Sequence, residues 1–302
     1  MGQQHRHNEC EQAPVNFSLV LATVGRVREL ETFLESLDQQ TYRSFELLVV
    51  DQNPDDRLAP LILKYGERFA LHHFRSKTGL SYARNVALPH VSGDVVAFPD
   101  DDCWYPQSVL EEVDALLRSR PQLDGVAGRC LTAAGTTRGR WANRAGLISK
   151  YNIFGRCISF TMFLRRKLVE RIGPFDESLG LGARSPWLGA EDYDYLLRAA
   201  LCGSGVYYDP QIFVYHRDLP SAFDARDRSK RYGGALGFGR FLAKHRYPLP
   251  FVAYYALRYL ADAAFSLVLG NVPKARYRWA TLIGHFEGWL GGVRESAVRS
   301  NT

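Results

Sequence analysis

A short apolar run followed by three consecutive aspartates is the feature that most constrains the fold of this chain. The run from Val95 to Phe98 is long enough for one buried strand and too short for a helix. Asp100, Asp101 and Asp102 follow it after a proline. Adjacent carboxylates repel one another, and a hard divalent cation, which takes oxygen ligands, relieves that repulsion. A solvated acidic turn is the alternative, but the buried strand before the triplet favours a site for Mg²⁺ or Mn²⁺.

The region from residue 17 to about 216 alternates between predicted strands and predicted helices. Apolar runs predict strands at 17–22, 45–50, 71–74, 95–98, 125–131 and 160–164, and a strand, turn and strand over 205–215. Apolar residues at helical spacing predict helices at 28–39, 58–69, 79–88, 108–117 and 165–171, and another that begins at 191. This alternation predicts an α/β fold with a mostly parallel central sheet flanked by helices. The sequence contains neither a GxGxxG nor a Walker A motif, so nothing in it indicates a Rossmann dinucleotide site or a P-loop.

Three further polar residues lie where such a fold binds ligands. Asp51 follows the second strand, a position from which a carboxylate can accept hydrogen bonds from a ribose or a base. Arg84 lies in the helix that Gly79 begins, and its charge adds to the N-terminal amides that could bind an anion. A lone histidine is more often structural than ligating, but His216 ends a strand, as the aspartate triplet does. All three are therefore candidate ligand-binding residues.

Glu191 and Asp192 form a second acidic group, at the start of a predicted helix. The helix dipole alone favours acidic residues in a first turn, which is the structural alternative. Three glycines between residues 180 and 189 nevertheless provide a flexible approach, so that a ligand could lie close to this helix start. Both carboxylates are therefore candidate catalytic groups.

Charge is divided unevenly along the chain. Residues 226–302 carry 13 Lys and Arg against 4 Asp and Glu, a net charge of +9, whereas the remainder has a net charge of −3. A basic extension suggests an anionic partner, and its many Tyr, Trp, Leu and Phe residues favour a membrane surface over nucleic acid. The segment 251–269 is mostly apolar, but the i,i+4 pair Arg258 and Asp262 makes it a poor transmembrane candidate. Packing of these helices on the rest of the protein is an equally open alternative.

These patterns predict three regions. Residues 1–14 are polar and lack the apolar segment of a signal peptide, so we expect a disordered lead-in. Residues 15–225 would form the α/β domain, and residues 226–302 a basic, aromatic-rich helical extension. The five cysteines are scattered, which indicates a reducing compartment and argues against a disulfide framework or a zinc site.

As a set, these motifs resemble those of an inverting glycosyltransferase of family 2, a family with a GT-A type fold. The resemblance spans roughly two-thirds of the chain and rests on Ala22-Thr23 with Arg26, Val50-Asp51, Gly79–Asn85, PDDDCWYP, Gly173–Glu177, Gly189–Arg198 and the strand into His216. The chain departs from the family at Gly25, where Asn is frequent. Its triple aspartate also makes the register of the metal-binding DxD motif ambiguous. We take Asp100 and Asp102 as the pair, with Asp101 as the rival.

The resemblance implies a metal-dependent hexosyltransferase that moves a sugar, with inversion, from a nucleotide-diphosphate sugar to a hydroxyl of a saccharide or lipid-linked saccharide. Asp192 by preference, and Glu191 otherwise, would act as the base. The nucleotide sugar would be bound by Thr23, Arg26, Asp51, Arg84, Asp100 and Asp101. Mg²⁺ or Mn²⁺ would be held by Asp100, Asp102 and His216. Similar bacterial enzymes build surface polysaccharides, which implies a cytoplasmic protein on the inner face of the cell membrane.

Two other classes remain as alternatives. The first is a non-catalytic binding module that uses a transferase-like fold and a basic extension to dock on membranes or partners. Loss of the aspartate triplet or of the Glu191–Asp192 pair would favour it, but both are present. The second is a metal-dependent phosphatase or nucleotidyltransferase, which an aspartate cluster after the first strand would favour. Here the cluster follows the fourth predicted strand.

Overall fold

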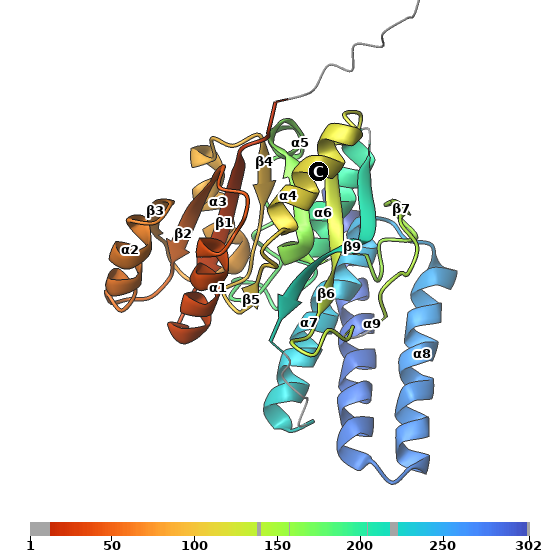
Figure 1. Ribbon diagram of the computed structural model, residues 1–302. Helices are drawn as coiled ribbons and strands as arrows, with labels where there is room; N and C mark the ends of the chain where they lie inside the picture. Colours follow the sequence, from red (N-terminus) through yellow and green to blue (C-terminus); the bar gives the residue numbers. More distant parts are fainter. Residues whose placement is uncertain (1–12, 138–139, 157, 204, 218–222, 301–302) are drawn as a thin grey trace, which may run out of the picture.

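Four parallel strands form one half of the central sheet (Figure 1). The structure is a computed structural model that describes residues 13–300 apart from 138–139, 157, 204 and 218–222, so the predicted disordered lead-in lies almost wholly outside the described residues. The four strands are β1 (Phe17–Thr23), β2 (Phe45–Asp51), β3 (Ala70–Arg75) and β4 (Val95–Ala97), in the order β3-β2-β1-β4. Every residue of β1, β2 and β4 is buried, which explains their continuous apolar sequences.

Strand register brings the predicted polar residues to one edge of this half-sheet. Thr23 pairs with Asp51 across β1 and β2. Ala22 forms an isolated parallel bridge with Asp100, directly after β4. Because all these strands run in the same direction, their carboxyl ends meet at the edge where α/β sheets bind ligands.

The second half of the sheet is mixed. β8 (Met162–Arg165) pairs with β4, and the sheet continues through β6 (Gly125–Leu131), β9 (Val206–His216) and β5 (Cys103–Trp104), while β7 (Gly146–Leu147) also pairs with β9. Parallel pairing covers the first four strands and the pair β6–β9. The pairs that involve β5, β7 or β8 are antiparallel.

β9 is one strand where the sequence predicted two. Its register with β6 shifts between Ala127 and Arg129, so that residues 209–212 of β9 face a single residue of β6. Pro210, which has no amide to donate, lies in this bulge. The predicted turn is therefore present as a bulge inside the strand, which continues to His216.

Helices cover both faces of the sheet and enclose two cores. One face is covered by α1 (Arg28–Asp38), α2 (Ala59–Gly66) and α4 (Val109–Ser119). The other is covered by α3 (Leu80–Ala87), α5 (Arg166–Ile172) and α6 (Glu191–Cys202). Short 3₁₀ turns occur at η1 (Leu88–His90) and η2 (Ser159–Thr161). Successive side chains of a strand point to opposite faces, so β1 contributes Leu19 to the first core and Val20 to the second.

Three long helices follow the sheet: α7 (Ala225–Lys244), α8 (Leu249–Val268) and α9 (Val272–Ser300). α7 packs on the body through residues such as Phe241, and α9 packs along α7. The contact between α7 and α9 is close because glycines lie at the interface. A Cβ atom on Gly239 would overlap the carbonyl of His285, and one on Gly288 would overlap the carbonyl of Leu236. The glycines of this basic segment thus allow direct backbone contact between two helices.

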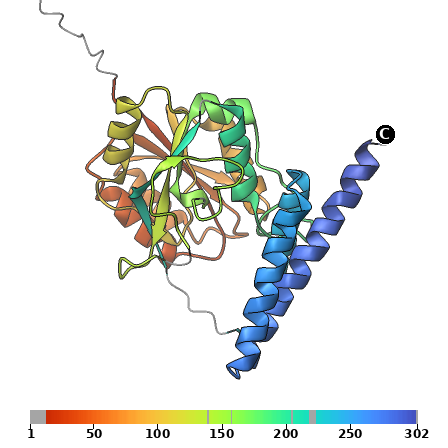
Figure 2. The ribbon, with the colours of Figure 1, turned by 90° about the vertical axis from the view of Figure 1, so that its right-hand side faces the viewer.

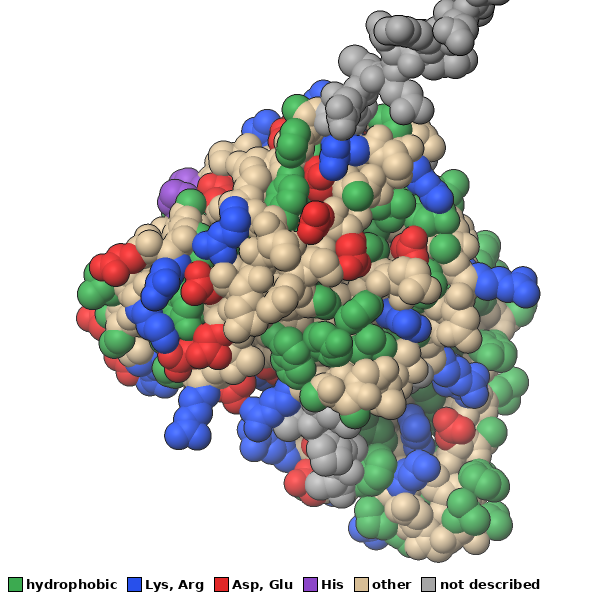
Figure 3. All heavy atoms as spheres, in the orientation of Figure 1, with side chains coloured by type: hydrophobic (Ala, Val, Ile, Leu, Met, Phe, Trp, Pro, Cys, Tyr) green, Lys and Arg blue, Asp and Glu red, His purple; other side chains and the backbone are tan. Residues whose placement is uncertain are grey.

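α8 and α9 form a helical pair that projects from the body of the molecule (Figure 2). Hydrophobic and basic side chains are interspersed over the face of this region that Figure 3 shows, and the exposed apolar residues include Leu257, Phe265, Val268, Trp279 and Phe286. Within the described ranges, α8 is long and apolar enough to cross a membrane. Length and composition alone are weak evidence for a membrane span, because a core helix of a soluble protein can pass the same test.

A charged residue of α8 contacts the neighbouring helix. Asp262 lies 3.9 Å from Nε of Arg278 on α9. Arg258, four residues before Asp262 on the same helix, is not among its ion-pair partners within the described residues.

Candidate active site

Asp101 anchors the turn that follows β4. It accepts hydrogen bonds from Thr23 Oγ1 and from Arg26 Nη1, each at 2.6 Å. Arg26 Nη1 also lies 2.7 Å from Oδ2 of Asp102. Burial raises the pKa of Asp101 to about 6, although the bonds from Thr23 and Arg26 oppose that shift. Thr23 and Arg26 thus hold the aspartate turn, and their contact with a nucleotide sugar stays a prediction.

Asp100, Asp102 and His216 converge beside this turn. Each offers one ligand atom, and these atoms all lie within 4.8 Å of one another. His216 Nε2 is 3.1 Å from Oδ1 of Asp102. The register of β5 and β9, which pairs Cys103 with His216, brings the imidazole to the turn. Phe160 stacks on the imidazole ring, with 5.0 Å between ring centroids.

This donor set fits a divalent cation. Two carboxylates and one imidazole supply three ligand atoms from one side, which leaves positions for water or phosphate oxygens. Asp101, the rival in the DxD motif, is not in this cluster of ligand atoms, and its two oxygens accept bonds from Thr23 and Arg26.

Arg84 lies between the aspartate turn and α6. Its side chain is fully buried, and its Nη2 donates to Asp100 Oδ1 and to Ser159 Oγ, both at 2.9 Å. Its Nε and Nη1 have no hydrogen-bond partner among the described residues. A buried guanidinium with spare donors can bind phosphate oxygens. The role of Arg84 toward the nucleotide sugar stays a prediction.

Glu191 and Asp192 begin α6, as the sequence predicted. Ala190 before them has a φ of 69°, a left-handed conformation that turns the chain into the helix. Burial, together with the charge of Asp192, raises the pKa of Glu191 to about 7. Burial also raises the pKa of Asp192 to about 6, and the charge of Arg84 opposes the shift in both groups. Carboxylates that titrate near neutral pH suit general-base chemistry.

The glycine segment before α6 allows the chain to pass close to the acidic pair. Gly180 has a φ of 101°, and a Cβ atom there would lie 3.2 Å from the side chain of Glu191. Leu179, next to it, accepts a hydrogen bond from Ser81 Oγ of α3 at 2.7 Å. This segment therefore connects the start of α6 to the helix that carries Arg84.

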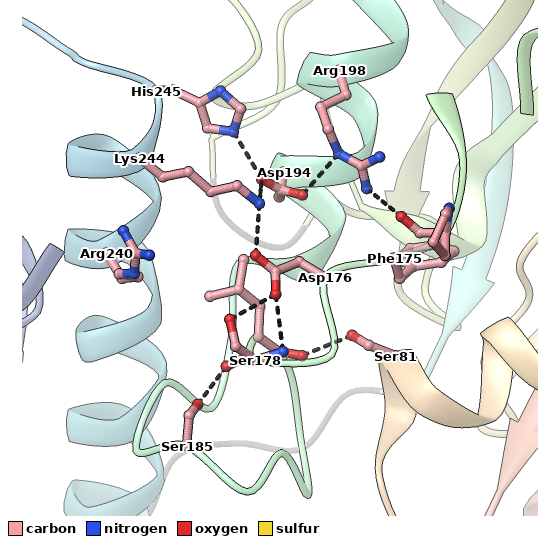
Figure 4. Close-up of polar contacts among 12 residues, drawn as sticks. Ser81, Phe175, Asp176, Ser178, Ser185, Asp194, Arg198, Arg240, Lys244 and His245 are labelled. Carbon is pink, nitrogen blue, oxygen red and sulfur yellow. Dashed lines mark hydrogen bonds and ion pairs between the residues drawn. The ribbon is translucent and has the colours of Figure 1, made fainter. Parts of the chain in front are cut away.

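A buried ion network fixes α6 against α7 (Figure 4). Oδ1 of Asp194 lies 2.7 Å from Lys244 Nζ and 2.8 Å from His245 Nε2, and its Oδ2 accepts from Arg198 Nε at 3.0 Å. Lys244 also donates to Asp176 at 2.7 Å. Burial opposes ionisation of Asp194, but the bond from His245 and the charges of Lys244 and Arg198 outweigh it and lower the pKa.

Sequence reasoning missed this network, and it also missed Gln52, which follows Asp51 at the carboxyl end of β2. Asp194 and Arg198 are four residues apart, a helical spacing that could have identified them. Lys244 comes from a distant helix, and no local pattern indicates it. Gln52 Oε1 accepts the amide of Gly79 at 2.7 Å and so orients the start of α3.

Asp51 is fully buried at the carboxyl end of β2. Its Oδ1 accepts bonds from the backbone and side-chain nitrogens of Asn53 at 2.8 and 2.7 Å. Its Oδ2 lies 3.2 Å from His73 Nε2 and 3.0 Å from Arg75 Nη1. These contacts stabilise the loop after β2. Contact of Asp51 with a ribose or base stays a prediction.

A cavity of about 430 Å³, the donor cavity, opens at this edge of the sheet. Its lining includes Arg26, Gln52, Asp100, Asp101, Asp102, Leu181 and His216. It therefore brings together most of the residues that the sequence predicted for the metal and the nucleotide sugar. Thr23, Asp51 and Arg84 are buried and do not line it.

Comparisons with known proteins find relatives in sequence and a similar fold. Two curated relatives are glycosyltransferase AglE of Haloferax volcanii, 26% identical over 61% of this chain and 64% of AglE, and the Escherichia coli enzyme UDP-Glc:alpha-D-GlcNAc-diphosphoundecaprenol beta-1,3-glucosyltransferase WfgD, 28% identical over 34% of this chain and 41% of WfgD. Less than two thirds of either relative is covered. The mannosyltransferase PcManGT of Pyrobaculum calidifontis, solved with GDP-Man and Mn²⁺, has a TM-score of 0.61 at 18% identity, over 91% of this chain and 88% of its own. That likeness shows a GT-A type fold.

The family follows from the match to a family model. Residues 18–173, just over half of the chain, match the model described as Glycosyl transferase family 2. This stretch contains β1, the aspartate turn and Arg84. The chain belongs to glycosyl transferase family 2.

Proposed function

We propose that this glycosyltransferase transfers a hexose, with inversion and with the help of a divalent cation, from a nucleotide-diphosphate sugar to a hydroxyl of a lipid-linked saccharide. The observation that carries the proposal is the convergence of Asp100, Asp102 and His216 on the donor cavity. The acidic pair at the start of α6 lies beyond the buried Arg84, whose charge acts on both groups of residues.

The donor side supports binding of a diphosphate. A cation held by Asp100, Asp102 and His216 would neutralise charge on the departing nucleoside diphosphate. The imidazole in the donor set favours Mn²⁺ over Mg²⁺, since Mg²⁺ prefers oxygen ligands. PcManGT was solved with GDP-Man and Mn²⁺, which agrees with this choice. Arg84, which is buried and outside the cavity lining, would support this site through its bond to Asp100.

The base is drawn from the acidic pair. Asp192, or otherwise Glu191, would accept the proton of the acceptor hydroxyl as that oxygen attacks the anomeric carbon opposite the leaving group. The raised pKa values make these carboxylates stronger bases, while part of the population is still ionised near neutral pH. Direct displacement inverts the anomeric configuration and needs no covalent intermediate.

We infer the lipid-linked acceptor and the location at the membrane from the C-terminal helices. The +9 charge of residues 226–302 and the exposed apolar side chains of α8 and α9 suit the inner face of an anionic membrane. The relative WfgD is named for an acceptor that carries diphosphoundecaprenol, a lipid-linked saccharide. We therefore propose a cytoplasmic protein with a catalytic region over residues 15–225 and a membrane-associating extension over 226–302.

A screen of nucleotide sugars tests this function. Purified protein with Mn²⁺ should release nucleoside diphosphate from one donor, faster with a lipid-linked acceptor, and NMR of the product should show an inverted anomeric centre. Release that continues in EDTA, or a product with retained configuration, would contradict the mechanism. Binding of donors without any release would support the non-catalytic module instead.

A further inference from the structure

A second cavity lies on the other side of the acidic pair. It measures about 430 Å³ and is enclosed by residues 154–155, the start of α6, α7 and α8. Among the described residues it shares no lining residue with the donor cavity. Ala190 lies in its wall, whereas Glu191, the next residue, packs beside Gly180 and hence near the donor-cavity residue Leu181. The two carboxylates therefore lie between two separate cavities.

Three arginines line this second cavity, which we call the arginine cavity: Arg140, Arg231 and Arg258. They come from a loop, from α7 and from α8. Arg231 is held at the wall because its Nε donates to Thr281 Oγ1 at 3.2 Å. Within the described ranges, no Asp or Glu lines the cavity and none lies within 4.0 Å of these guanidinium groups. Three cations around one space without a counter-ion form a strong site for a multiply charged anion.

The other walls of the arginine cavity are aromatic. Its lining includes Phe154, Tyr193, Phe238, Tyr255 and Tyr259. Such faces pack against apolar surface, while the tyrosine hydroxyls can bond polar groups. The cavity therefore suits a ligand that combines an anion with a ring-shaped, partly polar group.

An apolar groove follows the arginine cavity along α8. It measures about 450 Å³ and includes Ala263, Leu267 and Trp279 in its lining. Tyr255 and Tyr259 line the arginine cavity, and Ala263 and Leu267 continue the same series of four-residue steps. Residues four apart lie on one face of a helix. The charged cavity and the apolar groove are thus successive sites along one face of α8.

We propose that the arginine cavity binds the diphosphate of a lipid-linked acceptor through Arg140, Arg231 and Arg258. The sugar next to the diphosphate lies against the aromatic walls, near Asp192, and the lipid chain leaves along the apolar groove. This assignment rests on the proposed transferase function. A free diphosphate or a phospholipid headgroup has the same anionic chemistry, but neither uses the sugar-sized aromatic walls together with the adjacent groove.

Isothermal titration with two soluble probes tests the proposal. Geranyl diphosphate and inorganic pyrophosphate are titrated into the full-length protein in EDTA, which removes the cation from the donor cavity. Arg258→Gln and Arg140→Gln should each weaken geranyl diphosphate binding about tenfold, the usual effect of a lost charge-assisted hydrogen bond. Arg140 is exposed in a loop, so its substitution leaves the fold intact. Arg226→Gln is the matched control, because Arg226 is an exposed arginine of α7 outside the cavity lining, and it should change nothing.

The outcomes separate the sources of the anion. Equal affinity of the wild-type protein and both cavity variants for geranyl diphosphate would overturn the proposal. So would equal affinity for pyrophosphate and geranyl diphosphate, which would indicate a site for a free anion. Binding to phosphatidylglycerol vesicles is measured for the same variants. If the cavity variants lose only vesicle binding, the arginines bind lipid headgroups and the proposal is wrong.

Nucleotide-sugar hydrolysis by the wild-type protein separates this inference from the proposed function. If the protein hydrolyses a nucleotide sugar but shows no arginine-dependent binding of geranyl diphosphate, the proposed acceptor site is wrong and the transferase function is unaffected. Arginine-dependent binding without hydrolysis would contradict the transferase function and leave a diphosphate site of another kind.

Discussion

Lys244 Nζ lies 2.7 Å from Oδ1 of Asp194, and this contact joins the last turn of α7 to the helix that begins with the acidic pair. Asp194 is only two residues from Asp192, so the position of the proposed base depends on a helix far away in sequence. The side chain of Asp194 is 1% exposed, whereas its three partners, Lys244, His245 and Arg198, are partly exposed. The carboxylate is therefore the member of the network whose loss costs most.

Asp194→Asn should lower the free energy of unfolding by about 3 kcal/mol, because it leaves Lys244, His245 and Arg198 clustered without their anion. Urea denaturation measures the effect. Asp262→Asn is the control; that carboxylate is more exposed and lies 3.9 Å from Arg278, so a change within about 0.5 kcal/mol is expected. The lowered pKa of Asp194 also predicts how the free energy of unfolding changes with pH. Its stabilisation is complete above the unfolded value of about 4 and is lost as pH falls. Equal stability of both variants would show that the network contributes little.

The rate of transfer should depend on pH through the acidic pair. The pKa values of about 7 and about 6 belong to two neighbouring groups that titrate together. The base acts only when ionised, so kcat should rise through this range and level off above about pH 8. The measurement is kcat from pH 5 to 8.5 at saturating donor and acceptor. A flat profile with chemistry rate-limiting would exclude both carboxylates as the base.

Asp192→Asn should lower kcat by about 100- to 10,000-fold while the Kd for the donor stays nearly constant, because a general base acts in the transition state. Glu191→Gln is the parallel variant. Rapid-quench rates and donor titration calorimetry distinguish the two effects. A collapse of donor affinity in Asp192→Asn would assign that residue to binding or structure and leave Glu191 as the base.

Asp102→Asn and Asp100→Asn should weaken Mn²⁺ binding and abolish transfer, because each removes an ionised oxygen ligand. Asp101→Asn tests the alternative register. Its carboxylate bonds Thr23 and Arg26, so we expect Mn²⁺ affinity close to wild type. Electron paramagnetic resonance of Mn²⁺ gives the affinities directly. If Asp101→Asn alone loses the ion, the register is the other one.

The full-length protein should sediment with anionic liposomes, and added salt should weaken the association. Deleting residues 247–302 is a drastic test, since it uncovers the glycine face of α7. Leu257→Asp combined with Phe265→Asp is milder, because these side chains are 63% and 64% exposed. The double variant should remain in the supernatant with a wild-type melting temperature. Unchanged sedimentation would show that another surface binds the lipid, and no sedimentation of the wild type at low salt would refute the membrane proposal.

The first half of the sheet and the aspartate turn were predictable because burial on both faces leaves continuous apolar runs, as in β1 and β2. Contacts across long sequence separations were not. Lys244 reaches Asp194 from another helix, and no local sequence pattern indicates that contact. The bulge at Pro210 was misread for a related reason: the sequence indicates a turn, but pairing on both sides decides whether the strand continues.

The glycine contact between α7 and α9 has a consequence for the reach of the protein. Where backbone meets backbone, as at Gly239 and Gly288, no side chain can change rotamer to alter the helix angle. The projecting helices α8 and α9 are then held at a fixed angle to α7 and do not move as a hinge. If their apolar end rests in a bilayer, the height of Asp192 above the lipid is set by the geometry of α7 and α9. The distance between the bilayer and the acceptor hydroxyl would then be fixed by the protein and would not vary with helix motion.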